Sequence, residues 1–457
     1  MILRSTRVVL PDAVRPASIH IQDGVIARIG SFEESDDGPA TPKLAGHRAS
    51  EGWVISPGLV DTHVHVNEPG RTEWEGFDTA TRAAAAGGIT TIVDMPLNAV
   101  PSTTSVEGLE AKQAAARGRV HVDVAFWGGV VPGNADELDA LVDAGVRGFK
   151  CFLAPSGVDE FPAVDEDDLR AALPILARRN VPLLVHAEDP TWLTRPSNPS
   201  YPSYLSSRPA SAELAAIESM IRLSREFGVH VHIVHVACAE GVAEIARAKA
   251  GGVRITAETC PHYLTFAAED VGDGATEFKC APPIREARHR DALRDGLESG
   301  ALDLVATDHS PAPPAMKCPG DFVTAWGGIA SLELSLSAVW SSVGRGFQPR
   351  RGDAATVGDP ERVALQRLAR WMSEAPAALA GLGARKGRIA AGCDADLVVW
   401  DPDAEWTVDP WRLQQRHKLT PYAGRPLRGV VRSTYLRGER VWHDGALARA
   451  AGGRLLL

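Results

Sequence analysis

The chain has 457 residues, of which 44% are hydrophobic and 23% charged, a composition that is ordinary for a globular protein with a sizeable core. The net charge of -10, with no cluster of Lys and Arg, argues against a general nucleic-acid-binding protein. Neither a signal peptide nor a membrane span is expected, because the sequence has no apolar run long enough for either. None of the six cysteines forms a CxxC pair, so reduced thiols in the cytoplasm are the simplest expectation.

Both ends of the chain are rich in short β-type runs. Near the N-terminus, QDG at 22–24 is typical of a hairpin turn between two strands. DLVVWD at 396–401 and VVRSTYLRGERVW at 430–442 have the same character near the C-terminus. Two β-rich ends flank a different middle, so we expect them to pair into one small β-sandwich domain. The predicted division is 1–56 for its first part, 57–384 for the middle domain and 385–457 for its second part.

The middle of the chain alternates between strands and helices. Helical periodicity is clear at 211–225 and 239–250. Apolar β-rich runs begin near Leu59, Ile89, Val120, Val146, Val181, Val229, Val253 and Leu302. Eight strands with helices between them predict a (β/α)8 barrel of about 250 residues, the usual length of that fold. A doubly wound sheet would alternate in the same way, but eight repeats and no early GxGxxG favour the barrel. The Arg-rich stretch at 345–351 is expected to be a solvated loop.

The first predicted barrel strand carries two histidines, His63 and His65, in an apolar run. Side chains two residues apart in a strand point to the same side. In a barrel, that side can be the interior at the carboxyl ends of the strands, where active sites lie. Neutral imidazole suits zinc and similar ions. Alone, the pair fits a polar surface strand as well as a metal site.

Four later strands also end in a polar residue. These residues are Lys150, His186, His235 and Asp308. Parallel strands are buried on both faces and should be unbroken apolar runs, and a buried charge without a partner is costly. Five strands with a polar residue at the same end are therefore best explained by a shared metal ion.

This arrangement resembles the amidohydrolase superfamily, and within it the cyclic-amidohydrolase group of allantoinases, dihydropyrimidinases (hydantoinases) and dihydroorotases. The resemblance covers nearly the whole chain. It implies two divalent metal ions, usually zinc, although cobalt, manganese and iron suit the same ligands. It further implies that His63, His65 and Asp308 bind the more buried ion, and that His186 and His235 bind the second.

The resemblance also implies that Lys150 is carboxylated by carbon dioxide to N6-carboxylysine and bridges both ions. An ammonium offers only donors and cannot bind a cation, whereas a carbamate offers two anionic oxygens. Asp308 is implied to be the catalytic residue, which takes a proton from water and delivers it to the leaving nitrogen. The other histidines of these segments are expected to be structural or to support the ligands. These are His230, His232, His262 and His309.

Residues that flank these positions distinguish the members of the group. Dihydroorotases usually hold a substrate carboxylate with side chains at three positions, which here are Asn67, Ala281 and Ala312. Because none of these three residues is a cation, the acidic pyrimidine of a dihydroorotase is a poor fit. Dihydropyrimidinases usually have a tyrosine five residues beyond the bridging lysine, where this chain has Pro155.

Several segments look like those of allantoinases. They are 67–77 (NEPGRTEWEGF), 95–98 (MPLN), 148–152 (GFKCF), 258–264 (ETCPHYL), 308–317 (DHSPAPPAMK), 325–329 (AWGGI) and 416–425 (RHKLTPYAGR). The resemblance implies hydrolysis of the ring amide of allantoin to allantoate in purine catabolism, by a homotetramer without nucleic-acid or membrane partners. Asn98, Ser310 and the backbone of Cys280 and Gly328 are candidate contacts of this small-molecule substrate. A hydantoinase or dihydropyrimidinase is the alternative, and a non-catalytic scaffold a more distant one.

Overall fold

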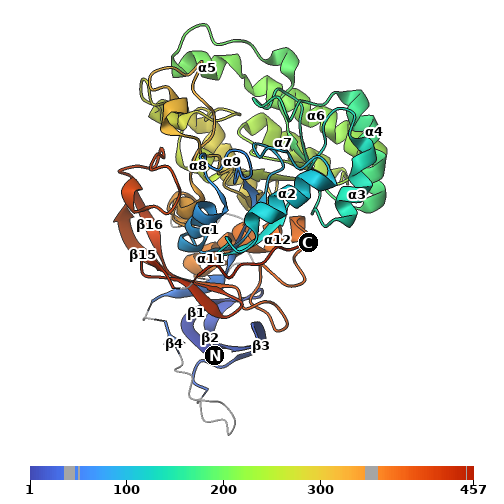
Figure 1. Cartoon of the computed structure of the whole chain (residues 1–457). Coiled ribbons are helices and arrows are strands. Elements are labelled where there is room, and N and C mark those ends of the chain that lie inside the picture. Colours follow the sequence, from blue (N-terminus) through green and yellow to red (C-terminus); the bar gives the residue numbers. More distant parts are fainter. Residues whose placement is uncertain (35–46, 50–51, 345–358, 449) are drawn as a thin grey trace.

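The structure is a computed structural model that describes residues 1–34, 47–49, 52–344, 359–448 and 450–457. A barrel of strands and helices lies beside a smaller β-domain whose strands come from near both ends of the chain (Figure 1). The predicted loop at 345–351 lies outside the described residues. In the part of the chain that is described, no helix combines the length and apolar character needed to cross a membrane.

The barrel strands are parallel and follow one another in chain order. They are β6 (Leu59–Val64), β7 (Ile89–Asp94), β8 (Asp123–Phe126), β9 (Gly128–Gly129), β10 (Phe149–Phe152), β11 (Leu183–His186), β12 (Val231–Ile233), β13 (Ile255–Thr259) and β14 (Leu304–Val305). Only Trp127 separates β8 from β9, so these two form one interrupted strand. A parallel bridge between Val64 and His309 joins the last strand to the first. The predicted eight-stranded barrel is thereby confirmed.

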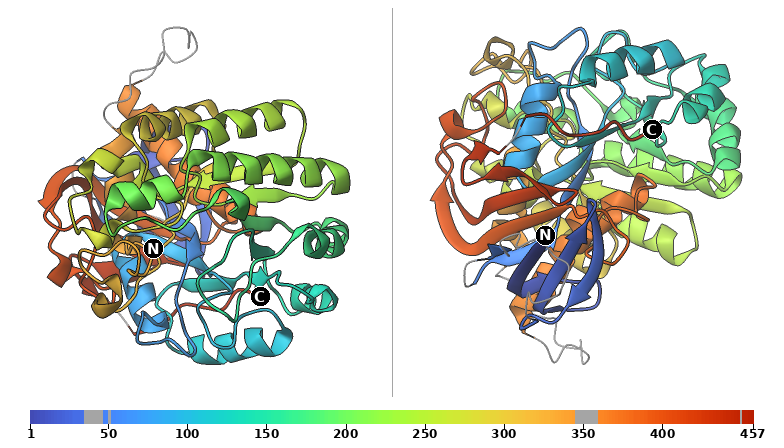
Figure 2. Two further views of the ribbon diagram at one scale, coloured as in Figure 1. Left: turned by 90° about the horizontal axis from the view of Figure 1, so that it is seen from above. Right: turned by 60° about the horizontal axis from the view of Figure 1, so that its bottom comes forward.

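Helices surround the strands when the barrel is seen from above (Figure 2, left). The helices are α1 (Phe77–Ala86), α2 (Val106–Ala116), α3 (Leu138–Asp143), α4 (Glu166–Arg179), α5 (Tyr201–Ser207), α6 (Ala210–Phe227), α7 (Ala239–Ala250), α8 (Pro261–Thr265), α9 (Ala287–Ser299), α10 (Ser335–Val339), α11 (Pro360–Ala369) and α12 (Ala375–Leu379). The longest, α6, buries Ile217 and Met220 at helical spacing and ends at Gly228, whose φ of 66° is left-handed. The predicted helices at 211–225 and 239–250 correspond to α6 and α7.

The two chain ends build the small β-domain. Its strands are β1 (Ile2–Val9), β2 (Val14–Gln22), β3 (Val25–Gly30), β4 (His47–Arg48), β5 (Val54–Pro57), β15 (Leu397–Thr407), β16 (Pro426–Leu436), β17 (Glu439–His443) and β18 (Ala446–Leu447). β5 pairs with β15, and this pairing joins the N-terminal and C-terminal strands (Figure 2, right). Asp23 and Gly24 form the predicted hairpin turn, with φ of 51° and 80°. The boundaries at 56/57 and 384/385 stay a prediction.

Candidate metal centre

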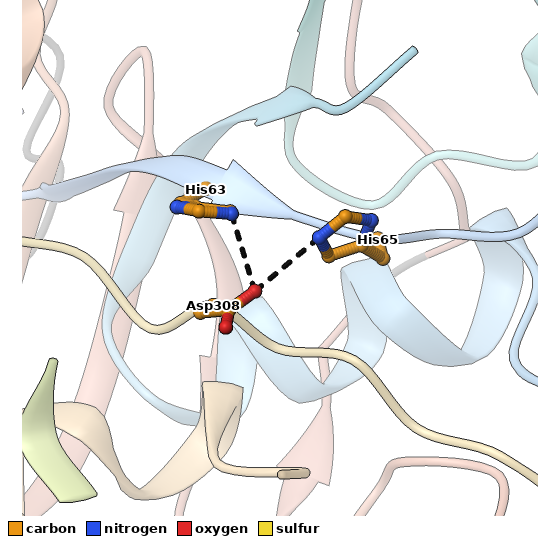
Figure 3. Close-up of side chains that lie close together, drawn as sticks. All are labelled: His63, His65 and Asp308. Carbon is orange, nitrogen blue, oxygen red and sulfur yellow. Dashed lines mark ion pairs between the residues drawn. The ribbon is translucent and has the colours of Figure 1, made fainter. Parts of the chain in front are cut away.

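His63, His65 and Asp308 meet at the carboxyl ends of the barrel strands (Figure 3). Nε2 of His63 lies 3.1 Å, and Nε2 of His65 3.3 Å, from the same oxygen of Asp308. One ligand atom from each residue lies within 4.8 Å of the others, and all three side chains are buried. Three potential ligand atoms at or just after the ends of two strands thus converge at one point inside the protein.

A fourth residue, Glu258 of β13, orients His63. Its Oε1 lies 2.5 Å from Nδ1 of His63, which leaves Nε2 to face Asp308. Burial alone would lower the pKa of His63, but the charges of Asp308 and Glu258 raise it to about 9. The site therefore has a negative potential that attracts a cation.

His186 and His235 form a second group beside the first. Nδ1 of His186 lies 3.0 Å from Nε2 of His235, and the rings of His235 and His63 are 5.5 Å apart between centroids. Burial lowers the pKa of His186, and lowers that of His235 well below its usual value. Both rings are therefore neutral near pH 7, which is the form that binds metals.

Lys150 of β10 is fully buried next to the second group. Its Nζ donates to the carbonyl of Cys151 at 2.9 Å and lies 3.7 Å from the ring centroid of Phe152. That ring stacks on His186 at 4.7 Å. Lys150 forms no ion pair within the described residues, and burial lowers its pKa to about 7. A neutral amine is nucleophilic and can react with carbon dioxide, so Lys150 is suited to carboxylation.

The donor set of both groups fits divalent metal ions. Imidazole nitrogens and a carboxylate oxygen are the ligands that zinc and related ions prefer. Nδ1 of His65 and Nδ1 of His235 are buried without a hydrogen-bond partner among the residues that the structure describes. A buried polar atom without a partner costs free energy, and a bound metal ion would satisfy these histidine side chains.

The two groups line a cavity of about 350 Å³. The predicted contacts Asn98, Ser310 and Gly328 lie on its wall. Cys280 does not: it is buried behind the wall, its neighbour Ala281 lines the cavity, and the carbonyl of Cys280 accepts a hydrogen bond from a tyrosine hydroxyl. Within the described residues, neither the side chain of Asn98 nor the hydroxyl of Ser310 has a hydrogen-bond partner. Both are therefore available to a ligand.

Gly328 shapes this wall through its lack of a side chain. Its φ is +127°, and a Cβ at this position would lie 2.3 Å from the carbonyl oxygen of Ser310. Its N–H donates to the carbonyl of Lys279 at 2.8 Å, and its carbonyl accepts from Lys317. The sequence predicted a backbone contact with substrate here, but both backbone groups already have a partner in the protein.

Sequence reasoning missed the two carboxylates that orient the histidines, Glu188 and Glu258. Glu188 Oε2 lies 2.7 Å from Nε2 of His186, and Glu258 Oε2 lies 3.0 Å from Nε2 of His232. The available signal was an acidic residue within or just after a buried strand. His232 lies deeper in the barrel than the candidate ligands His186 and His235, because it pairs with Leu184, two residues before His186.

The two remaining histidines near the strand ends do not join the cluster. Nδ1 of His309 accepts from the backbone N–H groups of Ser331 and Leu332, and its Nε2 faces Glu75 at 3.4 Å. His262 is buried against Tyr263, and neither of its ring nitrogens has a hydrogen-bond partner among the described residues. The contacts of His309 agree with a structural role, and the role expected for His262 stays a prediction.

Comparison with known proteins gives a consistent result. Residues 54–441 match the Amidohydrolase family. An allantoinase of Streptomyces avermitilis is 49% identical and covers 100% of this chain and 98% of its own length. An allantoinase of Arabidopsis thaliana is 41% identical over 100% of this chain and 90% of its own. Among solved structures, the L-hydantoinase (dihydropyrimidinase) from Arthrobacter aurescens superposes with a TM-score of 0.88, at 31% identity over 100% of this chain and 99% of that one.

Proposed function

The chain belongs to the amidohydrolase family and is a cyclic amide hydrolase, and we propose that it hydrolyses the hydantoin ring amide of allantoin to allantoate in purine catabolism. The observation that carries this proposal is the full-length similarity to bacterial and plant allantoinases. The cavity supports it, because a small neutral ureide needs a few polar side chains around a reactive base.

The ligand roles are part of the proposal. His63, His65 and Asp308 would hold one divalent ion, and His186 and His235 a second. Lys150, carboxylated by carbon dioxide, would bridge the two. Zinc suits this set best, with cobalt, manganese and iron as possible substitutes.

The chemistry follows from where Asp308 lies. Divalent ions at such a site lower the pKa of water and polarise a carbonyl oxygen. Asp308 lines the cavity and contacts both His63 and His65, so its free oxygen can accept the proton of the attacking water. The water oxygen bonds to the ring carbonyl carbon, and the bond from that carbon to the ring nitrogen breaks. Asp308 then returns the proton to the leaving nitrogen.

Substrate recognition would use the unpaired polar groups of the wall. The amide of Asn98 offers a donor and an acceptor, and the hydroxyl of Ser310 offers both. Trp326 lines the same cavity and supplies an apolar face. These groups match the alternating N–H and C=O groups of a ureide.

A substrate panel tests this function. Metal-reconstituted enzyme is assayed with allantoin, hydantoin, dihydrouracil and dihydroorotate, and kcat/KM is compared. We expect allantoin to be preferred. A higher kcat/KM for dihydrouracil would overturn the proposal and favour a dihydropyrimidinase, the activity for which the structurally similar protein from Arthrobacter aurescens is named.

If the protein were instead a non-catalytic scaffold, it would bind no metal even when carbon dioxide is plentiful. Metal analysis of the purified protein therefore separates it from both enzymes.

We also propose, from the resemblance, a homotetramer in the cytoplasm. All six cysteines are free, which agrees with a reducing compartment, and light scattering would measure the number of subunits.

A further inference from the structure

The second histidine group is attached to a buried ionic network that begins at Glu188. This carboxylate accepts from Nε2 of His186 at 2.7 Å, from Nε of Arg208 at 3.0 Å, and from Nη2 of the same guanidinium. Glu188 is fully buried, whereas the side chain of Arg208 is 20% exposed and lines the cavity. Because Arg208 holds Glu188 in place, the hydrogen bond that Glu188 accepts fixes the orientation of the His186 ring.

A second buried pair, Arg285 and Glu213, continues this network to His235. Nε of Arg285 donates to Glu213 at 2.7 Å, and its Nη1 donates to the carbonyl oxygen of Arg208 at 3.0 Å. The other oxygen of Glu213, a residue of α6, accepts from the backbone N–H of Ala237 at 3.0 Å. Ala237 lies two residues after His235. One network therefore reaches both histidines, the first through its ring and the second through its backbone.

The first group does not use these residues. His63 is oriented by Glu258, which is paired with His232 inside the barrel. No hydrogen bond or ion pair among the described residues joins Glu258 or His232 to Glu188 or Glu213. The two groups of candidate ligands are thus oriented by separate sets of buried residues.

We propose that Arg208, Glu188, Arg285 and Glu213 are positioning residues for the second metal position, and that they set its affinity independently of the first. The inference rests on the proposed function, because it assumes that both groups bind ions. Loss of Arg208 frees Glu188 and with it the ring of His186. Loss of the Glu213 charge loosens the Arg208 and Ala237 backbones and so acts on both histidines.

Cobalt binding tests the proposal. Metal-free wild-type enzyme, Arg208→Met, Arg208→Lys and Glu213→Gln are titrated with Co²⁺ in the presence of bicarbonate. Bound ions per chain and the visible spectrum of each added equivalent are measured. We expect the wild type to bind two ions, and Arg208→Met and Glu213→Gln to bind the first normally but the second about 10- to 100-fold more weakly. In these two variants, the visible spectrum of the second Co²⁺ equivalent should also differ from that of the wild type. Arg208→Lys should restore part of the affinity, because an ammonium can still pair with one oxygen of Glu188.

Lys386→Met is the matched control for a purely structural effect. It removes a buried cation from another carboxylate cluster, next to Asp123 at the start of β8. It should leave both cobalt affinities and both spectra unchanged. If Arg208→Met and Glu213→Gln bind both ions with wild-type affinities and spectra, the proposed positioning role of the network is wrong. A wild type that binds no ion would instead overturn the proposed metal centre, and this inference with it.

Discussion

Asp308 has two roles in the proposed reaction, as a ligand and as the group that moves the proton. Asp308→Asn keeps the shape of the side chain but removes its charge and its ability to accept a proton from water. We expect kcat for allantoin to fall by about 10²- to 10⁴-fold, the usual contribution of general acid–base catalysis. Steady-state kinetics with metal analysis of the same sample would measure this. An unchanged kcat would show that another group transfers the proton.

Lys150 tests whether the centre needs a carboxylated lysine. Lys150→Ala should lose most activity and bind fewer ions per chain, because two anionic oxygens are lost from between the two groups. Wild-type enzyme stripped of metal should recover activity faster when zinc is added with bicarbonate than without it. The variant should show no such difference. Equal metal content and turnover in the variant would contradict the assigned role.

The cluster of His63, His65 and Asp308 could be predicted from the sequence, but the residues that orient its side chains could not. His63, His65 and Asp308 interrupt apolar strands, and the barrel fold brings such interruptions to one rim. Glu188 and Glu258 act through distances between strands, which a linear pattern does not contain. Glu258 is 195 residues from His63 in the chain yet contacts its ring. Their role became visible only when the strands were placed side by side.

The segment around Gly328 shows how a loop between elements shapes the cavity. Gly328→Ala would force a left-handed φ on an L-residue and press a Cβ against the Ser310 carbonyl. The wall must then shift, with strain of about 1–3 kcal/mol. We expect a lower kcat/KM for allantoin, mainly through a higher KM, with unchanged metal content.

Gly327→Ala is the control for that prediction, because the adjacent glycine also lines the cavity. A Cβ on Gly327 would have its nearest neighbour, the Cα of Cys280, 4.0 Å away. This variant should keep kcat/KM close to the wild-type value. Equal losses in both variants would show that the tight contact at Gly328 is not the cause.

Periodicity predicted the strands and helices, but not how the barrel is completed. β14 has only two residues, and the chain closes the barrel through the bridge at His309. The C-terminal residues also pair with β8: the N–H of Val124 donates to Arg454 and that of Leu456 donates to Val124, both near 2.9 Å. This pairing depends on an edge that exists only in the folded barrel, so no local signal in the tail predicts it.

A buried cluster of charges joins the barrel to the C-terminal part of the β-domain. Nζ of Lys386 lies 2.8 Å from Asp123 of the barrel and 2.6 Å from Asp396, which precedes β15. Arg437, between β16 and β17, also pairs with Asp123. Because the carboxylates are buried, each cation compensates charges that would otherwise oppose folding. The C-terminal part of the β-domain is thus fixed to the amino end of β8, at the opposite end of the barrel from the candidate metal centre.

Two adjacent residues allow the stability contributed by a buried ion pair to be compared with that of an exposed one. Lys386 is 3% exposed and Arg385 60% exposed, yet both pair with Asp394. Lys386→Met should lower the free energy of unfolding by about 3–5 kcal/mol, because it leaves buried carboxylates uncompensated. Arg385→Met should lower it by at most about 1 kcal/mol, because an exposed pair is screened by water. Denaturant unfolding of the metal-free proteins measures both changes. Similar losses in the two variants would mean that the buried cluster is not what fixes the β-domain to the barrel.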